Sequence, residues 1–484
     1  MAETHRDEQL FEADLTPVEP DGGGSGGVNK TFRPYDPHQQ FLVPPSLEDW
    51  LPENDLARFV SDLVDEVIDL SPFLDSYKEV RGFPPYDPRL MLKLLLYGYS
   101  TGTRSSRAIE KACWHDVAFR WLAANQAPDF RSIARFRRRH LVVLRELFRK
   151  SLLVCKEAGM VRLGTVALDG TKVRANASRR KAMSYRHLTE KEQVLAAEVD
   201  ELLRDAEVTD SREDKALGKD NRDEDLPAEL ARRERRLEVM RRAKADLEER
   251  ARSEEADKAE KKADEKGLDE HERAVLVEAA IAAAIPKPTA QANFTDPDAR
   301  IMKTADGSFH YCYTAQAVVD DAHQVVIATS LTNRVADCPE LPAMLDQVSK
   351  NTGGTPRTLL ADAGYFSADN VTAATEANVD PFIATGRLRH GEEPPPAPRG
   401  RIPKGLSPKQ RMARKLRTKP GRAAYKRRKA IVEPVFGQVA VCQGGKTLLL
   451  RGIEGADGEW HLLLACHNFR KLFNFGGIGA LPAT

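Results

Sequence analysis

The sequence predicts an α/β fold: a mixed sheet with helices, preceded by an all-α region and interrupted by a charged helical insertion. From about 45 to 160, apolar residues recur at the spacing of amphipathic helices. After residue 164, short β-branched and apolar runs alternate with helical segments, an order typical of a mixed α/β sheet. Between 180 and 275, dense charged residues with Leu and Ala at helical spacing predict long solvated helices.

Length and composition bound the class of protein. With 484 residues, the chain has room for two or three domains that each bury a core. We expect a cytoplasmic protein, because no apolar run approaches the length of a membrane span and the acidic first residues lack the apolar stretch of a secretion signal. The six cysteines form no CxxC pair, which argues against a zinc ribbon or a disulfide framework.

The helical region contains an arginine-rich helix. Helices are predicted over 55–70, from Asp87-Pro88 onward, and over 105–113, 116–123 and 130–140. The last of these, with Asp129 or Ser132 as N-cap, carries Arg131, Arg135, Arg137, Arg138 and Arg139. Arginines at this spacing suit phosphates and guanine edges, so we interpret the region as a helix-turn-helix whose last helix faces DNA. The alternative is a solvated helix with Ile133 and Phe136 facing the core.

Three acids are candidates for catalysis. Asp169 ends the predicted strand that begins at residue 165, Asp362 ends the strand 358–361, and Glu433 lies in the helical segment 425–442. Carboxylates at the carboxyl ends of neighbouring strands converge on one edge of a sheet. With a Glu from a packed helix, they can hold two Mg²⁺ ions about 4 Å apart. Singly, each Asp is more often a turn residue and the Glu a salt-bridge partner, but their order along the chain favours a metal site.

Eight segments resemble insertion-sequence transposases of the DDE type, whose catalytic domain is ribonuclease-H-like. The resemblance covers about 38–475. In the sheet region it rests on VALDGTKVRANAS around Asp169, YTAQAVVDDAHQVV, LLADAGYFS around Asp362, YKRRKAIVEPVFGQV around Glu433, and RGIEGADGEWHLLLACHNFRKLF. In the helical region it rests on FLVPPSLEDWLP, YDPRLMLKLLLYGYSTGTRSSRAIEKAC and PDFRSIARFRRRH.

The resemblance implies a chemistry and its partners. It maps the catalytic, metal-binding acids of the family onto Asp169, Asp362 and Glu433, with Mg²⁺ as the metal and Mn²⁺ as an alternative. The implied substrate is double-stranded DNA: the terminal inverted repeats of the element and a target. Hydrolysis at the element ends would precede attack of the freed 3′-hydroxyl on the target. We expect a homodimer on DNA, because two ends must be joined together.

The helical signature around the family's Glu is matched in part. Tyr425 and Arg428 occupy its Tyr and Arg positions, with one extra residue before Glu433, whereas Ala440 stands where the family has a Lys. Pro434 predicts that no unbroken helix carries both Arg428 and Glu433. For the missing Lys, two interpretations stay open. Lys446 supplies the charge instead, or this copy is a slowed enzyme, which we favour because a Gly-Gly loop fixes a Lys poorly.

These observations divide the chain into five parts. We expect a disordered tail (1–40), an α-helical DNA-binding domain (41–160), a ribonuclease-H-like catalytic domain (161–179 and 291–475), the charged helical insertion (180–290) and a second tail (476–484). Residues 387–429 hold sixteen Lys or Arg against two Glu, and they are interpreted as a segment that tracks DNA, with a disordered linker as the alternative.

Two rival functions remain on the sequence alone. One is a transposase-derived DNA-binding protein with little or no catalysis, which only Ala440 favours and the three retained acids oppose. The other is a ribonuclease-H-like nuclease that cuts without joining strands.

Overall fold

The computed structural model describes residues 46–77, 84–217, 228–266, 268–304, 306–386, 395–403 and 405–481. The predicted disordered tail 1–40 and the last three residues lie outside this part. The helical region, the sheet and the charged insertion all lie in one compact unit, Leu47–Thr484.

The predicted helical region is present, and its helices begin at side chains that cap them. Asp87, Ser105, Asp116 and Asp129 each accept a hydrogen bond from a backbone N–H of the following first turn, as N-cap residues do. The elements are η1 (Leu47–Trp50), α1 (Leu56–Asp62), a π-helical turn (Leu63–Val67), α2 (Ser71–Leu74), α3 (Pro88–Thr101), α4 (Ser106–His115), α5 (Val117–Leu122), α6 (Phe130–Arg139) and α7 (Leu141–Glu157).

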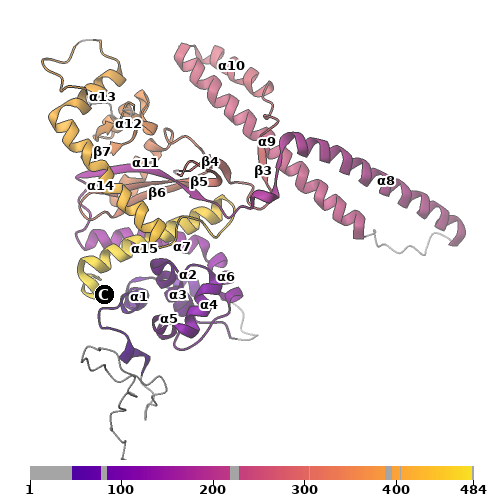
Figure 1. The fold of residues 1–484 in the computed structure, drawn as a ribbon, viewed down its shortest axis with the longest axis horizontal. Helices are drawn as coiled ribbons and strands as arrows, with labels where there is room; N and C mark the ends of the chain where they lie inside the picture. Colours follow the sequence, from indigo (N-terminus) through magenta and orange to yellow (C-terminus); the bar gives the residue numbers. More distant parts are fainter. Residues whose placement is uncertain are drawn as a thin grey trace, which may run out of the picture. The chain divides into compact units, whose positions relative to one another are not determined.

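The predicted mixed sheet is confirmed (Figure 1). In the described residues, six strands form it: β1 (Thr165–Arg174), β4 (Arg300–Lys303), β5 (Phe309–Asp320), β6 (Val326–Thr332), β7 (Thr358–Ala361) and β8 (Asp380–Ile383). The order is β4-β5-β1-β7-β8, and β6 pairs with β5. Strands β4 and β6 are antiparallel to β5, as is β1, whereas β1, β7 and β8 are parallel to one another. The carboxyl ends of the parallel-paired segments of β1, β7 and β8 therefore lie at the same edge of the sheet.

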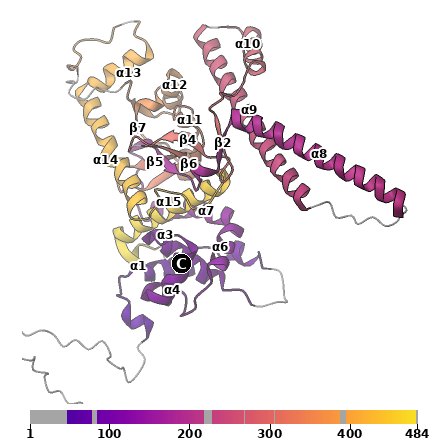
Figure 2. The ribbon, with the colours of Figure 1, turned by 45° about the vertical axis from the view of Figure 1, so that its right-hand side comes forward.

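Helices cover the sheet and join it to the helical region (Figures 1 and 2). They are α11 (Glu340–Thr352), α12 (Ala368–Glu376), α13 (Pro408–Arg417), α14 (Lys419–Val441) and α15 (Ile453–Gly476), with the short η3 (Arg179–Lys181), η4 (Ala363–Tyr365) and η5 (Gly477–Ala480) elsewhere. Helix α15 packs along α7 and against β6 and α3, and α14 packs against β1, β5 and β7. None of the helices in the described part is long and apolar enough to cross a membrane.

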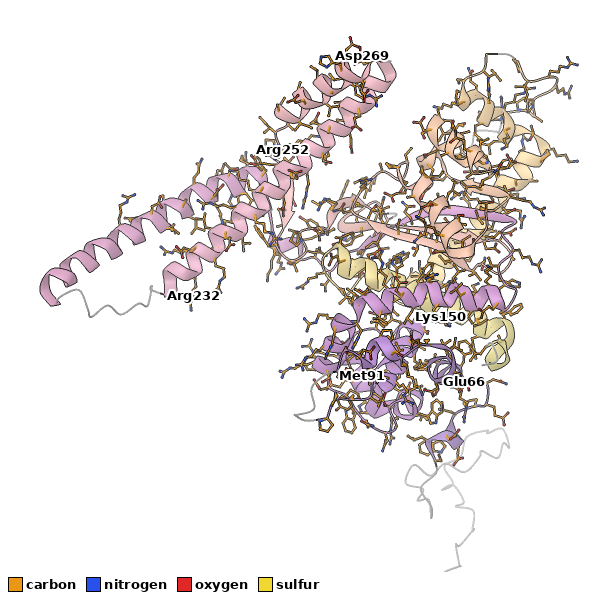
Figure 3. The ribbon with its side chains drawn as sticks, turned by 180° about the vertical axis from the view of Figure 1, so that it is seen from behind. Glu66, Met91, Lys150, Arg232, Arg252 and Asp269 are labelled. Atoms are coloured by element: carbon orange, nitrogen blue, oxygen red, sulfur yellow. The ribbon has the colours of Figure 1, made fainter. Side chains whose placement is uncertain are left out.

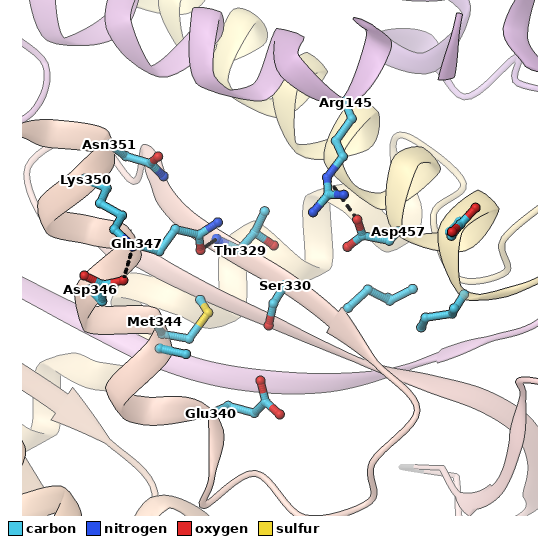
Figure 4. A pocket seen from close by; sticks show the side chains of 14 residues that line it. Arg145, Thr329, Ser330, Glu340, Met344, Asp346, Gln347, Lys350, Asn351 and Asp457 are labelled. Atoms are coloured by element: carbon cyan, nitrogen blue, oxygen red, sulfur yellow. Dashed lines mark hydrogen bonds and ion pairs between the residues drawn. The ribbon is translucent and has the colours of Figure 1, made fainter. Parts of the chain in front are cut away.

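Strand β6 lies at an edge of the sheet, and two side chains of helix α11 bind backbone groups along this edge (Figure 4). The Thr329 N–H donates to Gln347 Oε1 at 2.9 Å, and Asn351 Nδ2 donates to the carbonyl of Ile327 at 3.0 Å. Because an open row of backbone groups invites pairing with another chain, these two side chains block extension of the sheet at β6.

The charged segment after β1 is helical, and it closes on itself at its base. It consists of α8 (Tyr185–Leu217), α9 (Ala228–Lys266) and α10 (Glu270–Ala282), and the two ends meet in the antiparallel pair β2 (Ala182–Ser184) and β3 (Gln291–Asn293). A small apolar cluster between α8 and α9 includes Leu188, Leu195, Leu237 and Met240. Charged side chains such as Arg232 and Arg252 line α9 (Figure 3), as expected for long solvated helices.

The predicted break at Pro434 is wrong, because α14 runs without interruption from Lys419 to Val441. A proline leaves the carbonyl four residues earlier without its helical donor, here that of Ala430. Gln324 Nε2 donates to this carbonyl at 2.9 Å. The same side chain is fixed at its Oε1, which accepts from Lys471 Nζ at 2.8 Å. A side chain from the turn between β5 and β6 thus replaces the missing hydrogen bond.

A buried ion pair joins the helical region to α15. Arg104 Nη1 lies 2.8 Å from Glu459 Oε1, and the Glu459 side chain is fully buried. Tyr99 donates to the same oxygen at 3.2 Å, and Glu459 Oε2 accepts the N–H groups of Leu449 and Leu450 at 2.7 and 2.8 Å. All described partners of this carboxylate are therefore structural contacts with the helical region and with the loop before α15.

Glu459→Gln should lower the free energy of unfolding by about 3–5 kcal/mol, because it leaves the Arg104 charge buried without its counter-charge. The matched control is Glu454→Gln, which neutralises an exposed acid on the same helix and should change stability by less than about 0.5 kcal/mol. Urea unfolding followed by fluorescence measures both. Equal losses in the two variants would contradict a special role for the pair.

Candidate active site

The parallel register of β1 and β7 brings two of the predicted acids together. Leu168 pairs with Ala361 as the last pair of the two strands, so Asp169 and Asp362 follow side by side. Asp362 directly follows β7, as predicted. Asp169 does not end its strand, because β1 continues to Arg174 through its antiparallel pairing with β5. The predicted strand end is therefore only the end of the pairing with β7.

The two aspartates differ in their hydrogen-bond partners. Asp169 Oδ1 accepts from its neighbour Gly170 N at 3.0 Å, and its Oδ2 lies 2.6 Å from Arg428 Nη1. Burial raises the pKa of the Asp169 carboxyl, although Arg428 and the Gly170 N–H act in the opposite direction. Asp362 Oδ1 accepts from Gly364 N at 2.7 Å. In this arrangement Arg428 supplies the positive charge that faces Asp169.

Arg428 retains a donor that no described residue satisfies. Its side chain comes from α14, the residue is 9% exposed, and its guanidinium lies 5.9 Å from the ring centre of Tyr425. The Nε atom is buried and has no hydrogen-bond partner among the described residues. Since a buried donor without an acceptor is costly, this atom is suited to an oxygen of a bound anion such as a phosphate.

Glu433 lies on α14 but does not join the two aspartates. Five residues after Arg428, it points about 140° away around the helix. Its side chain is 57% exposed and lies 3.9 Å from Lys429. Within the described ranges, no three His, Cys, Asp or Glu side chains are gathered closely enough to hold a metal ion. The three acids offer the carboxylate oxygens that Mg²⁺ prefers, but the Asp169–Arg428 contact must open before Asp169 Oδ2 can bind a cation.

A fourth acid, Asp337, lies beside the two aspartates, and it was not predicted from the sequence. It precedes α11 and accepts from Gln316 Nε2 at 2.8 Å. Tyr365 in turn donates to Gln316 Oε1. One signal was available in the sequence, because Gln316 is a polar residue inside the apolar run of β5, and a polar side chain at a buried position needs a partner.

A basic cavity of about 450 Å³ lies between β1 and α14, beside the strand residues that follow Asp169. Its walls include the three cations Lys172, Arg174 and Lys446, the aromatic Phe436 and Trp460, Ala440, and one acid, Asp306, which lies 3.0 Å from Arg174. Residues 433, 436 and 440 follow one face of α14, so the cavity continues the face that carries Glu433. Cations beside an acidic centre suit the phosphates of a strand that leaves it.

The backbone of the loop that carries Lys446 is held on both sides. Gly445 N donates to Val439 O at 2.7 Å, and Arg104 Nη2 donates to Thr447 O at 2.7 Å. The Lys446 carbonyl accepts from Arg174 N at 3.2 Å. Lys446 and Ala440 line the same cavity, so a lysine is present where the helical position lacks one.

The arginine-rich helix α6 shows both predicted faces. Ile133 and Phe136 are buried in the core, while Arg131, Arg135, Arg138 and Arg139 are exposed. Arg139 is engaged within the chain, because it donates to the Ser76 carbonyl and its guanidinium lies 4.6 Å from the Tyr77 ring centre. Arg131, Arg135 and Arg138 follow one another at helical spacing on the exposed face. That spacing suits a row of phosphates or base edges.

The basic run 387–429 is helical in most of its described part. Helix α13 and the first half of α14 occupy it, and residues 387–394 and 404 lie outside the described part. Some of its cations are paired with acids of the sheet: Lys415 with Asp380, and Arg427 with Asp321. The run is therefore attached to the sheet at these two points.

Two family models match the chain. One, described as Transposase domain (DUF772), covers residues 45–139, which contain helices α1 to α6. The other, described as Transposase DDE domain, covers residues 286–469, which contain Asp362 and Glu433 but not Asp169. No curated protein and no solved structure matches the chain. The first model matches the helical region, and the second matches most of the sheet with its helices. The chain belongs to the insertion-sequence transposases of the DDE type.

Proposed function

We propose that this transposase binds the terminal inverted repeats of its insertion sequence, cleaves phosphodiester bonds there and joins the 3′-hydroxyl ends to target DNA. The observation that carries the proposal is the β1–β7 register, which sets Asp169 beside Asp362. Asp169 lies in β1, and Asp362 follows β7, the parallel neighbour of β1. This arrangement supports a ribonuclease-H-like catalytic domain.

In this proposal Asp169, Asp362 and Glu433 hold the divalent metal, Mg²⁺ or in its place Mn²⁺. When bound, the metal activates the attacking oxygen and stabilises the leaving oxygen. Arg428, freed from Asp169, directs its guanidinium, including the unpartnered Nε, to the scissile phosphate. Tyr425 keeps the guanidinium oriented by lying against it.

DNA binding is proposed for two surfaces. The exposed arginines of α6 bind the element end, and Lys172, Arg174 and Lys446 of the basic cavity bind the strand beyond the scissile phosphate. A homodimer on DNA follows from the need to join two ends. The rival functions, a DNA-binding protein without catalysis and a nuclease that does not join strands, are separated from this proposal by a strand-transfer assay with pre-cut ends.

Asp169→Ala, Asp362→Ala and Glu433→Ala should each reduce cleavage of a labelled element end by at least about 100-fold while affinity for the uncut end changes by no more than about twofold. Carboxylates that hold the metal act on the scissile phosphate, whereas affinity comes mainly from Lys and Arg. Gel-shift and cleavage assays in Mg²⁺ measure the two effects separately.

The control for these variants is Asp346→Ala, an exposed acid on α11 that is paired with Lys350 and should cleave normally. Near-normal cleavage by any one of the three variants would show that its acid is wrongly assigned. For Glu433, the next candidate on α15 would then be Glu454.

Replacing Arg131, Arg135 and Arg138 together by Ala should weaken binding of the element end and reduce the slope of log K against log salt by about three units, one for each phosphate that the helix no longer neutralises. The control triple Arg232, Arg235 and Arg236→Ala removes the same charge from the exposed surface of α9. Binding isotherms between about 50 and 200 mM salt measure the slopes. Equal slopes in the two triples would assign α6 no specific DNA contact.

Lys446→Ala should lower strand transfer by about fivefold, the effect of one phosphate contact of about 1 kcal/mol. Adding Ala440→Lys to this variant should restore most of the loss, because both positions line the same cavity. Single-turnover strand transfer with pre-cut ends measures the rates. If Lys446→Ala has no effect and Ala440→Lys alone accelerates transfer, this copy is instead a slowed enzyme.

A further inference from the structure

We propose that Asp337 is a fourth acid of the active site, a positioning residue that helps to hold the divalent cation beside Asp362. The inference rests on the proposed function, since it assumes that Asp362 binds the metal. It extends that function to a residue between β6 and α11 that no part of the three-acid pattern includes.

The backbone after each catalytic aspartate is shaped around the Asp337 carboxylate. A Cβ atom added at Gly170 would lie 2.9 Å from Gln316 Nε2 and 3.0 Å from Asp337 Oδ1, and one added at Gly364 would lie 3.3 Å from Asp337 Oδ2. Only glycine leaves this space free, since real Cβ contacts are rarely so close. The Asp337 carboxylate, with Gln316 beside it, thus lies against both segments that follow Asp169 and Asp362.

Asp337 and Asp362 approach one another over Gly364. The same added Cβ at Gly364 would lie 3.0 Å from Asp362 Oδ1, so the two carboxylate oxygens are separated by no more than the sum of these two distances. Two charges at this separation share the field of one cation. The charge of Asp337 would therefore add to that of Asp362 at a bound cation, although no three acids of the described residues form a ligand group.

A buried network fixes the direction of the Asp337 side chain. Gln316, which is fully buried, donates to Asp337 Oδ1 at 2.8 Å, and the buried Tyr365 donates to Gln316. Lys172 Nζ lies 3.7 Å from the same carboxylate. Burial raises the pKa of Tyr365, and the charges of Asp337, Asp169 and Asp362 raise it further, which agrees with their common position around this ring. The carboxylate is therefore oriented before any ligand binds.

The test measures binding of Mn²⁺ itself to the full chain without DNA, by counting free Mn²⁺ with electron paramagnetic resonance. Asp337→Asn keeps an acceptor for Gln316 but removes the charge, so its affinity for Mn²⁺ should fall about fivefold to tenfold. Asp362→Asn should lower the affinity further. Asp346→Asn, which neutralises an exposed acid of α11 that is paired with Lys350 (Figure 4), should bind as the wild type does.

Asp337→Glu distinguishes the effect of the charge from the effect of the side-chain shape. It keeps the negative charge that Asp337→Asn removes, but its longer side chain crowds Gly170 and Gly364. Tighter Mn²⁺ binding by Asp337→Glu than by Asp337→Asn supports the proposal even if both variants are less stable, provided that binding is measured below both unfolding midpoints. Wild-type affinity in Asp337→Asn, with Asp362→Asn weakened, would reduce Asp337 to a structural partner of Gln316 and leave the proposed function standing. Wild-type affinity in Asp362→Asn would overturn both.

Discussion

The buried pair of Arg104 and Glu459 is the contact on which the relation between the helical region and the sheet depends. Arg104 reaches from the turn before α4 to α15, and it also donates to the carbonyls of Gly444 and Thr447. On its other side, Arg137 of α6 donates to the Arg104 carbonyl at 3.2 Å. The helix proposed to read DNA and the loop that carries Lys446 are thus held by one set of buried polar contacts. Such a set tolerates little change, because each unpaired charge would remain buried.

The active site combines rigid and adjustable parts. The two aspartates are fixed by strand pairing, and Asp337 by a buried hydrogen-bond network. Glu433 and Arg428, in contrast, come from α14, where the arginine faces Asp169 and the glutamate faces solvent. The ion pair between Arg428 and Asp169, a proposed metal ligand, offsets the repulsion between the Asp169 and Asp362 carboxylates. We infer that the last step in building the site takes place at the α14 side chains, not in the sheet.

Features set by neighbouring residues could be predicted from the sequence, and features set by distant residues could not. Asp87 and Asp129 cap their helices through bonds to the next two or three residues, and Asp362 follows a short apolar strand. The continuation of β1 beyond Asp169 depends on its pairing with β5, and the whole charged insertion separates these two strands in the sequence. The intact α14 depends on Gln324, whose side chain comes from a turn far from Pro434 in the sequence. The position of Asp337 could not be predicted for the same reason, since only the fold places it beside Asp169 and Asp362.

The short antiparallel pair β2 and β3 has a consequence for how this chain can change over generations. Its three residue pairs bring the two ends of a segment of roughly a hundred residues to one point, with Tyr185 N and Ala290 O bonded at 2.8 Å just beyond them. The entropy of closing the loop depends only weakly on the length between such ends. Changes in the length of α8 to α10 should therefore disturb the β1–β5 pairing little, provided that the contact of Arg250 on α9 with the Pro297 carbonyl is kept. At the β2–β3 pair, the chain can therefore exchange one inserted segment for another without moving the carboxylates of Asp169 and Asp362.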